Sequence, residues 1–240
     1  MEISNMWDYY NNYKPNKPKA DPVKQIEKLR KKNPDIQPVT IAGKLANSWW
    51  AQSWNKNLEG YADYSNRIGR GRSYVRGGYV LDLSISRCSV QSLVQGTRAK
   101  PYEITVEIDP LQKEKWDAVV EQCSRKIGNL EDLVSGKFPQ KLMELFTRRG
   151  DGLFPSPKEI HFSCSCPDWA SMCKHVAATL YGIGVRFDSD PTLFFLLRDI
   201  DFAELLKKSV DEKMKSMLSN AGKVTSRVMS GVDTYELFGV

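Results

Sequence analysis

Cysteine and histidine are scarce in this chain, since its 240 residues contain five cysteines and two histidines. So few cysteines exclude the disulfide-dense scaffolds on which small secreted domains depend. The N-terminal residues contain no apolar core of a signal peptide, so the sequence predicts a cytoplasmic protein with reduced thiols. In such a compartment, cysteines and histidines that gather in one segment indicate a metal site more than a disulfide.

Long apolar runs and nucleotide-binding motifs are absent as well. No stretch of about 18 apolar residues occurs, so we expect no membrane-spanning segment and no membrane partner. The phosphate-binding pattern G-x-x-x-x-G-K-[ST] is missing, so the chain is not expected to be an ATP-driven motor. No nucleophile, acid and base are visible in a catalytic arrangement, and we therefore expect neither an enzyme nor a small-molecule substrate.

Acidic residues are missing from one stretch, between Asp63 and Asp82, in a chain whose net charge is +6. We interpret SNRIGRGRSYVRGGYV, within this stretch, as an arginine-rich loop. Arginine presents a planar fork to phosphate oxygens, glycine allows close backbone approach, and tyrosines between cations can stack on bases. The loop predicts nucleic-acid binding; the alternative is a solvated loop whose arginines pair with distant acids. The candidate contacts are Arg67, Arg70, Arg72 and Arg76, together with Arg98 and Lys100 in a later turn.

Alternation of apolar and polar residues predicts a small antiparallel sheet in an α+β fold. A helix capped by Ser48 would place Trp50, Trp54 and Leu58 on one face, as core residues or, in the alternative, as platforms for bases. Further helices are expected at 23–32, from Pro110 to Ile127 and within 138–149. The three expected strands are GYVLDLSIS (78–86), SVQSLVQG (89–96) and PYEITVEI (101–108).

Three of the five cysteines and one histidine lie within twelve positions, in the segment FSCSCPDWASMCKH (162–175). Their spacing is C-x-C-x6-C-x-H, which makes two close pairs separated by a loop. Zinc prefers four tetrahedral sulfur or nitrogen ligands, so the two pairs can close around one ion. The segment KEIHFSC is typical of a strand before this loop, and HVAATLYGIG of a helix after it. The expected zinc ligands are Cys164, Cys166, Cys173 and His175.

Two other interpretations of this cluster remain open. The cysteines could be incidental core residues beside a buried histidine, or the C-x-C pair could be a redox pair. Both leave part of the four-residue pattern unexplained. If the site holds zinc, three thiolates and one imidazole fill all four positions and leave none for a reactive water. The cluster therefore indicates a structural metal, while Cys88 and Cys123 are expected to be ordinary structural residues.

The pattern in CPDWASMCKHVAA resembles the SWIM zinc finger, known from proteins linked to Swi/Snf ATPases and Mu-type transposases. Other segments, among them SWWAQSWNKNLE, VQGTRAKPYEITVEI and DSDPTLFFLLRDIDFAELL, look like bacterial and archaeal SWIM zinc finger family proteins from about residue 40 onward. The resemblance implies that the four ligands named above bind zinc. It also implies nucleic acid as a partner, DNA rather than RNA, and a Swi/Snf-type helicase as a protein partner.

We thus expect a non-catalytic protein that binds nucleic acid through the finger and the arginine-rich loop. The alternative is an adaptor that docks on a larger protein complex without touching nucleic acid. Four apolar residues are expected to pack on the helix of the finger, or alternatively to form a partner-docking helix: Leu193, Leu196, Leu197 and Ile200. The expected regions are a basic flexible arm (1–38), a basic α+β module (39–110), a helical connector (111–150), the SWIM-type finger (151–186) and a helical C-terminal region (187–240).

Overall fold

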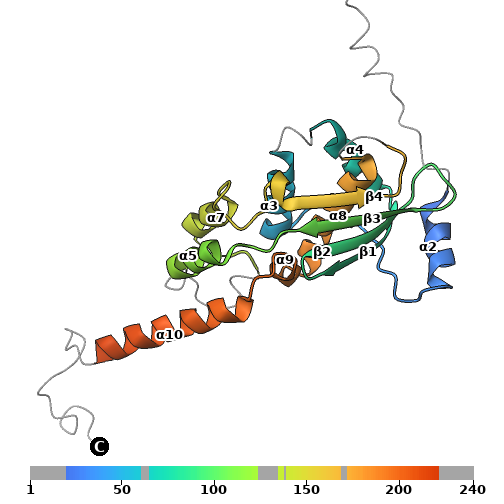
Figure 1. Ribbon diagram of the computed structural model, residues 1–240. Helices are drawn as coiled ribbons and strands as arrows, with labels where there is room; N and C mark the ends of the chain where they lie inside the picture. Colours follow the sequence, from blue (N-terminus) through green and yellow to red (C-terminus); the bar gives the residue numbers. More distant parts are fainter. Residues whose placement is uncertain (1–19, 61–64, 124–134, 138, 169–171, 222–240) are drawn as a thin grey trace, which may run out of the picture.

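A four-stranded antiparallel sheet lies at the centre of the computed structural model of this protein (Figure 1). The strands follow one another across the sheet in sequence order, and helices flank them. The α+β class expected from the sequence is thereby confirmed. The structure describes residues 20–60, 65–123, 135–137, 139–168 and 172–221. The strands are β1 (Val80–Ser86), β2 (Ser89–Val94), β3 (Tyr102–Ile108) and β4 (Ile160–Cys164).

Alternation along the strands buries one face of the sheet and leaves the other in contact with water. In β3, Ile104 and Val106 are buried, whereas Glu103 and Glu107 are exposed. Val90 of β2 lies opposite Val106, so apolar side chains of neighbouring strands share the buried face. This pattern is that of an antiparallel sheet covered on one side, as the period-two alternation of the sequence predicted.

The fourth strand belongs to the same sheet as the three strands upstream. β4 pairs with β3 in antiparallel register, with Cys164 opposite Ile104 and Ile160 opposite Ile108. The strand that was expected to begin the finger is therefore held by the main sheet through backbone hydrogen bonds. The connection between β3 and β4 contains α5 (Lys113–Cys123), which begins after the expected Pro110, then α7 (Gln140–Thr147) and the short 3₁₀ turn η2 (Pro157–Glu159).

Helix α8 (Lys174–Ser189) is the central helix, and every residue from His175 to Gly184 is buried. It contacts all four strands as well as helices α3 (Trp49–Glu59) and α4 (Ser65–Arg76). Because α8 begins at the predicted finger and runs beneath the sheet, the finger and the core of the protein share one helix.

Helix α3 begins at the cap expected from the sequence, because the side chain of Ser48 accepts a backbone hydrogen bond from its first turn. Trp50 and Trp54 are fully buried, which confirms their interpretation as core residues. The indole N–H of Trp54 donates to the carbonyl of Leu180 at 2.8 Å, so its polar atom is also satisfied. The two tryptophans therefore pack α3 inside the core.

The arginine-rich stretch forms helix α4, so our prediction of a loop there was wrong. Ile68 and Val75 are buried on one side of this helix, and Gly71 between them lies against α8. A Cβ on Gly71 would lie 2.6 Å from the carbonyl carbon of Ala177. The spacing i, i+3, i+7 of these three positions is helical, so this glycine permits close helix packing and does not signal a loop.

Helix α9 (Thr192–Leu197) buries Phe194 and Phe195 against Trp50, with ring centroids 5.2 and 5.3 Å apart. Leu196, which we expected in this core, is instead 38% exposed. A short helix presents only one face to the core, and here Phe194, Phe195 and Leu197 occupy that face, which confirms the expected burial of Leu197.

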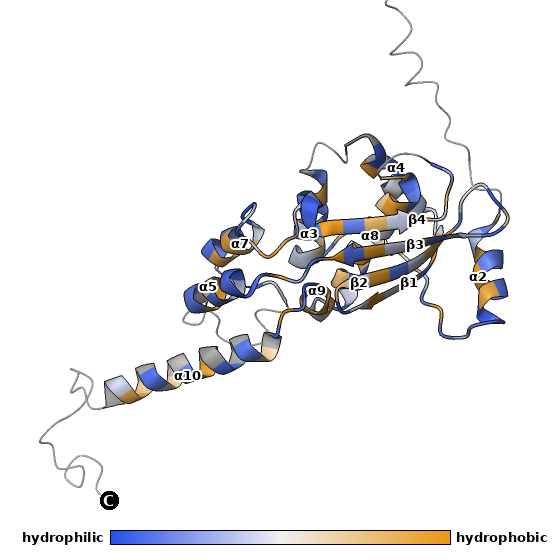
Figure 2. Cartoon of the chain, in the orientation of Figure 1, coloured by the Kyte–Doolittle hydropathy of each residue, from blue (hydrophilic) through white to orange (hydrophobic). Residues whose placement is uncertain are grey.

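Helix α10 (Phe202–Ala221) extends away from the sheet, and helix α2 (Pro22–Arg30) lies at the opposite end of the molecule (Figure 1). Hydrophilic and hydrophobic residues alternate along α10 (Figure 2), and Val210, Met214 and Met217 are exposed. Within the described ranges, no helix has both the length and the apolar character needed to cross a membrane.

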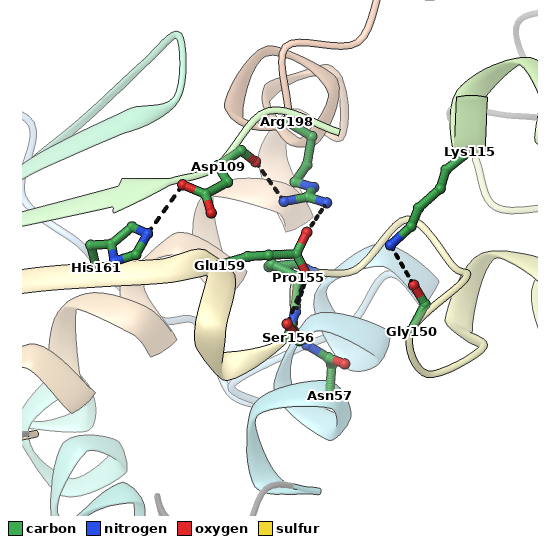
Figure 3. A network of polar contacts seen from close by, with 9 residues as sticks. All are labelled: Asn57, Asp109, Lys115, Gly150, Pro155, Ser156, Glu159, His161 and Arg198. Carbon is green, nitrogen blue, oxygen red and sulfur yellow. Dashed lines mark hydrogen bonds and ion pairs between the residues drawn. The ribbon is translucent and has the colours of Figure 1, made fainter. Parts of the chain in front are cut away.

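A buried arginine joins the C-terminal part to the end of the sheet (Figure 3). Arg198 is 1% exposed, and its guanidinium donates to the carbonyl of Asp109 at 2.6 Å and pairs with Glu159 at 2.8 Å. Burial opposes ionisation of Glu159, but hydrogen bonds from Ser156 and Arg198 outweigh this effect and lower its pKa. Nε2 of His161 lies 3.1 Å from Oδ1 of Asp109, on the exposed side of β4.

Replacing the packed glycine by Gly71→Ala is expected to destabilise the protein by about 1–3 kcal/mol, because the new methyl group overlaps the backbone of Ala177. Gly69→Ala in the same helix is the matched control, since nothing lies within 4 Å of its Cβ. Alanine favours helix, so this control should be neutral or stabilising by up to about 1 kcal/mol. Urea unfolding measures both, and equal destabilisation would contradict the close packing.

Candidate metal centre

The four expected metal ligands converge at one end of the sheet, where β4 leads into α8. Cys164, Cys166, Cys173 and His175 each offer one ligand atom, and these atoms all lie within 4.8 Å of one another. The first two side chains are half-buried and the last two are buried. Three thiols and one imidazole in this arrangement could hold a metal ion such as zinc.

Backbone pairing in the sheet positions the first two cysteines. Cys164 ends β4 opposite Ile104. The next residue continues the pairing, because the N–H of Ser165 donates to the carbonyl of Glu103 at 3.0 Å and its hydroxyl accepts from the N–H of Glu103 at 2.9 Å. Side chains two residues apart on an extended chain point to the same side. Cys164 and Cys166 are therefore directed together before the chain turns.

The start of α8 positions the other two ligands. Cys173 is the N-cap residue, in an extended conformation, and its sulfur accepts from the N–H of Val176 at 3.5 Å. The positive end of the helix dipole favours a thiolate at this position. The preceding loop is tied to α4, because Arg67 pairs with Asp168 at 2.9 Å. Both ends of the loop are thus fixed by elements of the core.

His175 presents Nδ1 to the sulfurs. This nitrogen lies 3.7 Å from Sγ of Cys173 and 4.0 Å from Sγ of Cys164. One zinc ion about 2.3 Å from a sulfur and about 2.1 Å from an imidazole nitrogen requires these atoms to be less than about 4.4 Å apart. Both distances meet this requirement, so the geometry of the donor set fits zinc.

Two tyrosines and a glycine surround the imidazole of His175. Its ring centroid lies 4.5 Å from that of Tyr102 and 5.6 Å from that of Tyr74. Its Nε2 is buried without a hydrogen-bond partner among the described residues, and a Cβ on Gly96 would lie 2.9 Å from it. These three residues were not predicted as part of the site, because their separation in the sequence gives no local signal.

The three thiols compete for negative charge. The pKa of Cys173 is lowered to about 4, first by a hydrogen bond from Cys164 and then by His175 and the N–H of Val176, although burial acts in the opposite direction. The same hydrogen bond, together with burial, raises the pKa of Cys164, and burial raises that of Cys166. A divalent cation bound by these sulfurs would stabilise all three as thiolates.

Two of the arginines predicted to contact nucleic acid form internal ion pairs. Arg67 pairs with Asp168, as described above. The guanidinium of Arg72 lies 2.5 Å from Glu59 and donates to the hydroxyl of Tyr181 at 2.7 Å. These two side chains therefore follow the alternative interpretation, in which the arginines pair with acids that are distant in the sequence. Arg67 connects α4 to Asp168 in the loop that follows β4, and Arg72 connects α4 to helices α3 and α8.

Other basic residues lie at the surface near the metal centre. The guanidinium of Arg98 lies 5.9 Å from the ring centroid of Tyr102, and the ammonium of Lys174 lies 5.4 Å from that of Tyr74. Each tyrosine that packs on His175 therefore carries a cation on its ring. Of the remaining candidates, Arg70 is half-buried, Arg76 is exposed, and the exposed Lys100 pairs with Glu103 at 3.0 Å.

Comparison with known proteins identifies a homologue. The chain is 37% identical, over 172 residues, to a Mycobacterium tuberculosis protein named "Uncharacterized protein Rv2102". The aligned part covers 71% of this chain and 62% of the relative, so the chain spans less than two thirds of that protein's length. No family model matches the chain. No solved structure matches it either.

Cys173→Ser is expected to abolish stoichiometric zinc binding and to lower the melting temperature, because the energy of metal binding contributes directly to folding. Elemental analysis of the purified protein and thermal unfolding measure the two effects. Cys88→Ser is the matched control, because Cys88 lies in the turn between β1 and β2, at the other end of β2. Unchanged zinc content in the Cys173 variant would show that this sulfur is not a ligand.

Gly96→Ala is expected to weaken zinc binding, because the new methyl group would overlap the ring of Tyr102 and lie 2.9 Å from Nε2 of His175. Zinc affinity is measured by competition with a chromogenic chelator, and a loss of about 10–100-fold is typical when the support of a ligating histidine is disturbed. Gly69→Ala, which meets no neighbour, is the control. Equal affinities of the two variants would contradict this account of the imidazole pocket.

Proposed function

We propose that this protein is a non-catalytic zinc protein with a SWIM-type finger, and that it binds nucleic acid with the surface around its metal centre. The finger assignment is supported by the C-x-C-x6-C-x-H spacing and by the strand, loop and helix that carry the four ligands. Zinc is favoured over other metals because three thiolates and one imidazole are a ligand set typical of structural zinc sites.

The ligand set supports a structural role for the metal. Three cysteines and one histidine complete a tetrahedral coordination, whereas a catalytic zinc keeps one position for water or substrate. Three thiolates also neutralise the charge of the ion, which makes it a poor Lewis acid. The metal would thus hold the end of β4 against the start of α8, and a surface built on these two elements would depend on it.

The observation that carries the nucleic-acid proposal is the pair of cations placed on the two tyrosines beside His175. Arg98 and Lys174 lie over the rings of Tyr102 and Tyr74, and both rings pack on the imidazole. Both rings are buried, so they hold the two cations in place, and cations fixed at a surface are the groups that contact phosphates in proteins that bind nucleic acid. The metal centre would in this way fix the positions of the phosphate-binding groups.

DNA is favoured as the nucleic acid, and a Swi/Snf-type helicase as the protein partner, on the SWIM resemblance. Because the sequence has no phosphate-binding loop of its own, the ATPase in such an assembly would be a separate chain. This protein would then supply nucleic-acid binding to the complex.

A second candidate function is that of a protein-interaction adaptor. It is favoured by helix α10, where Val210, Met214, Met217 and Leu218 are exposed by 56 to 69%. Apolar residues at spacings of four and three lie along one side of a helix and are typical of a surface that binds a partner. Both functions can coexist, because α10 extends away from the metal centre (Figure 1).

Duplex DNA binding by the zinc-loaded protein is expected to weaken steeply as salt rises from about 50 to 200 mM, because phosphate contacts release counterions. Arg98→Gln with Lys174→Gln should weaken binding and reduce the slope of log affinity against log salt by about 1.8, at about 0.9 for each lost contact. Fluorescence anisotropy measures the affinities, and elemental analysis verifies that the variant retains zinc.

The control for this experiment is Lys113→Gln with Lys141→Gln, which removes the same charge from exposed positions on α5 and α7. It should bind as the unmodified protein does. Absence of any salt-dependent binding to DNA or RNA would reject the nucleic-acid proposal. The adaptor function would then be favoured if a protein complex copurifies with the unmodified protein and no longer copurifies when Met214 and Met217 are changed to serine.

A further inference from the structure

A groove of about 490 Å³ lies between helix α2 and the loop that joins β2 to β3. One wall comes from α2 and the residues that follow it, and the other comes from residues 93–103. No residue of α2 is buried, and Lys28, Lys32 and Lys100 on the two walls are exposed, so their charged groups are accessible to a partner.

Positive charge collects around this groove. Lys28 and Lys32 lie four residues apart on one wall, and Lys100 lies on the opposite wall. The lining includes one acid, Glu103, which pairs with Lys100. In the part of the chain that the structure describes, Lys28 and Lys32 have no ion pair. Lys28 lies on α2 and Lys32 lies in the turn after it, and both face the groove without an acid between them, so an anion is the favoured occupant.

The inner surface of the groove is apolar. Leu29 contributes from the helix, and Leu93 and Pro101 contribute from the sheet and the loop. All three are only half-buried, so their apolar surface is still available for contact. A single-stranded nucleic acid combines the two chemistries that this groove offers, since it has anionic phosphates and the apolar faces of unpaired bases. A duplex keeps its bases stacked inside and would use the lysines alone.

The groove and the surface beside the candidate metal centre share one loop. The loop 95–101 carries Lys100 into the groove and Arg98 onto the ring of Tyr102, which packs on His175. This loop is held in place by the fully buried Gln95, whose amide N–H groups donate to the carbonyls of Gly96 and Arg98. A nucleic-acid strand that contacts Arg98 can therefore also reach the groove, because Lys100 in the groove lies two positions after Arg98 in the same loop.

We propose that this groove is a binding site for single-stranded nucleic acid, in which Lys28, Lys32 and Lys100 contact phosphates while bases lie on Leu29, Leu93 and Pro101. The proposal rests on the proposed function, because it extends the same nucleic-acid surface from the metal centre to helix α2. It adds a preference for single strands over duplex, which the metal centre alone does not imply.

The test uses the full zinc-loaded chain and a labelled oligothymidine, with a duplex of the same length for comparison. Lys28→Gln with Lys32→Gln should weaken binding of the single strand about tenfold at low salt. It should also reduce the slope of log affinity against log salt by about 1.4, at about 0.7 for each phosphate contact on a single strand. Leu29→Gln should weaken binding of the single strand and leave duplex binding unchanged, because only unpaired bases reach the apolar surface.

The control is again Lys113→Gln with Lys141→Gln, on helices at the other end of the molecule from α2 (Figure 1). It should bind like the unmodified protein, and thermal unfolding should be the same for the lysine variants because the altered lysines are exposed. If the unmodified protein binds the oligonucleotide and the Lys28 and Lys32 variant binds equally well, the groove proposal is overturned while the proposed function stands. If no protein binds nucleic acid, both are rejected.

An acidic peptide is the other occupant that this chemistry could accept. A labelled peptide of alternating glutamate and leucine is therefore titrated under the same conditions. If it binds more tightly than the oligonucleotide and depends on Lys28 and Lys32, the groove is a peptide site and the proposal is overturned. If it binds weakly and is displaced by oligothymidine, the assignment to single-stranded nucleic acid is supported.

Discussion

The approach of three sulfurs and one imidazole at the junction of β4 and α8 is the constraint on which the other features of this protein depend. The four potential ligand atoms lie within 4.8 Å of one another, and a divalent cation bound among them would stabilise the three sulfurs as thiolates. The junction also joins the last strand of the sheet to its most buried helix. Coordination of a metal here would therefore stabilise the core of the whole protein as well as one loop.

The basic residues near this junction divide into two groups with different roles. Arg67 and Arg72 are paired with acids and hold α4 against the loop that follows β4 and against helices α3 and α8. Arg98 and Lys174 lie on the tyrosine rings beside His175. A net charge of +6 does not distinguish these groups, because the sum is the same whether a cation is internal or available to a partner. Only the second group contributes to the proposed nucleic-acid surface.

Close packing explains why residues without obvious chemistry matter for the site. Gly71 lets α4 approach the backbone of α8, and that approach brings Tyr74 to the imidazole. The absence of a side chain at Gly96 leaves room for Nε2 of His175 and for the ring of Tyr102. The position of His175 is thus set by packing against Tyr74, Tyr102 and Gly96, and not by a hydrogen bond to its Nε2 among the described residues.

The sequence by itself determined the strands, the buried tryptophans and the group of candidate metal ligands. Each of these follows from local spacing: alternation along 102–108, the four-residue interval between Trp50 and Trp54, and two close pairs of ligands around one loop. The tertiary structure decided the rest. It packed the arginine-rich helix closely on α8 at Gly71, assigned acids to two of its arginines and opened a groove beside α2. These outcomes depend on contacts between segments far apart in the chain, and local periodicity carries no information about such contacts.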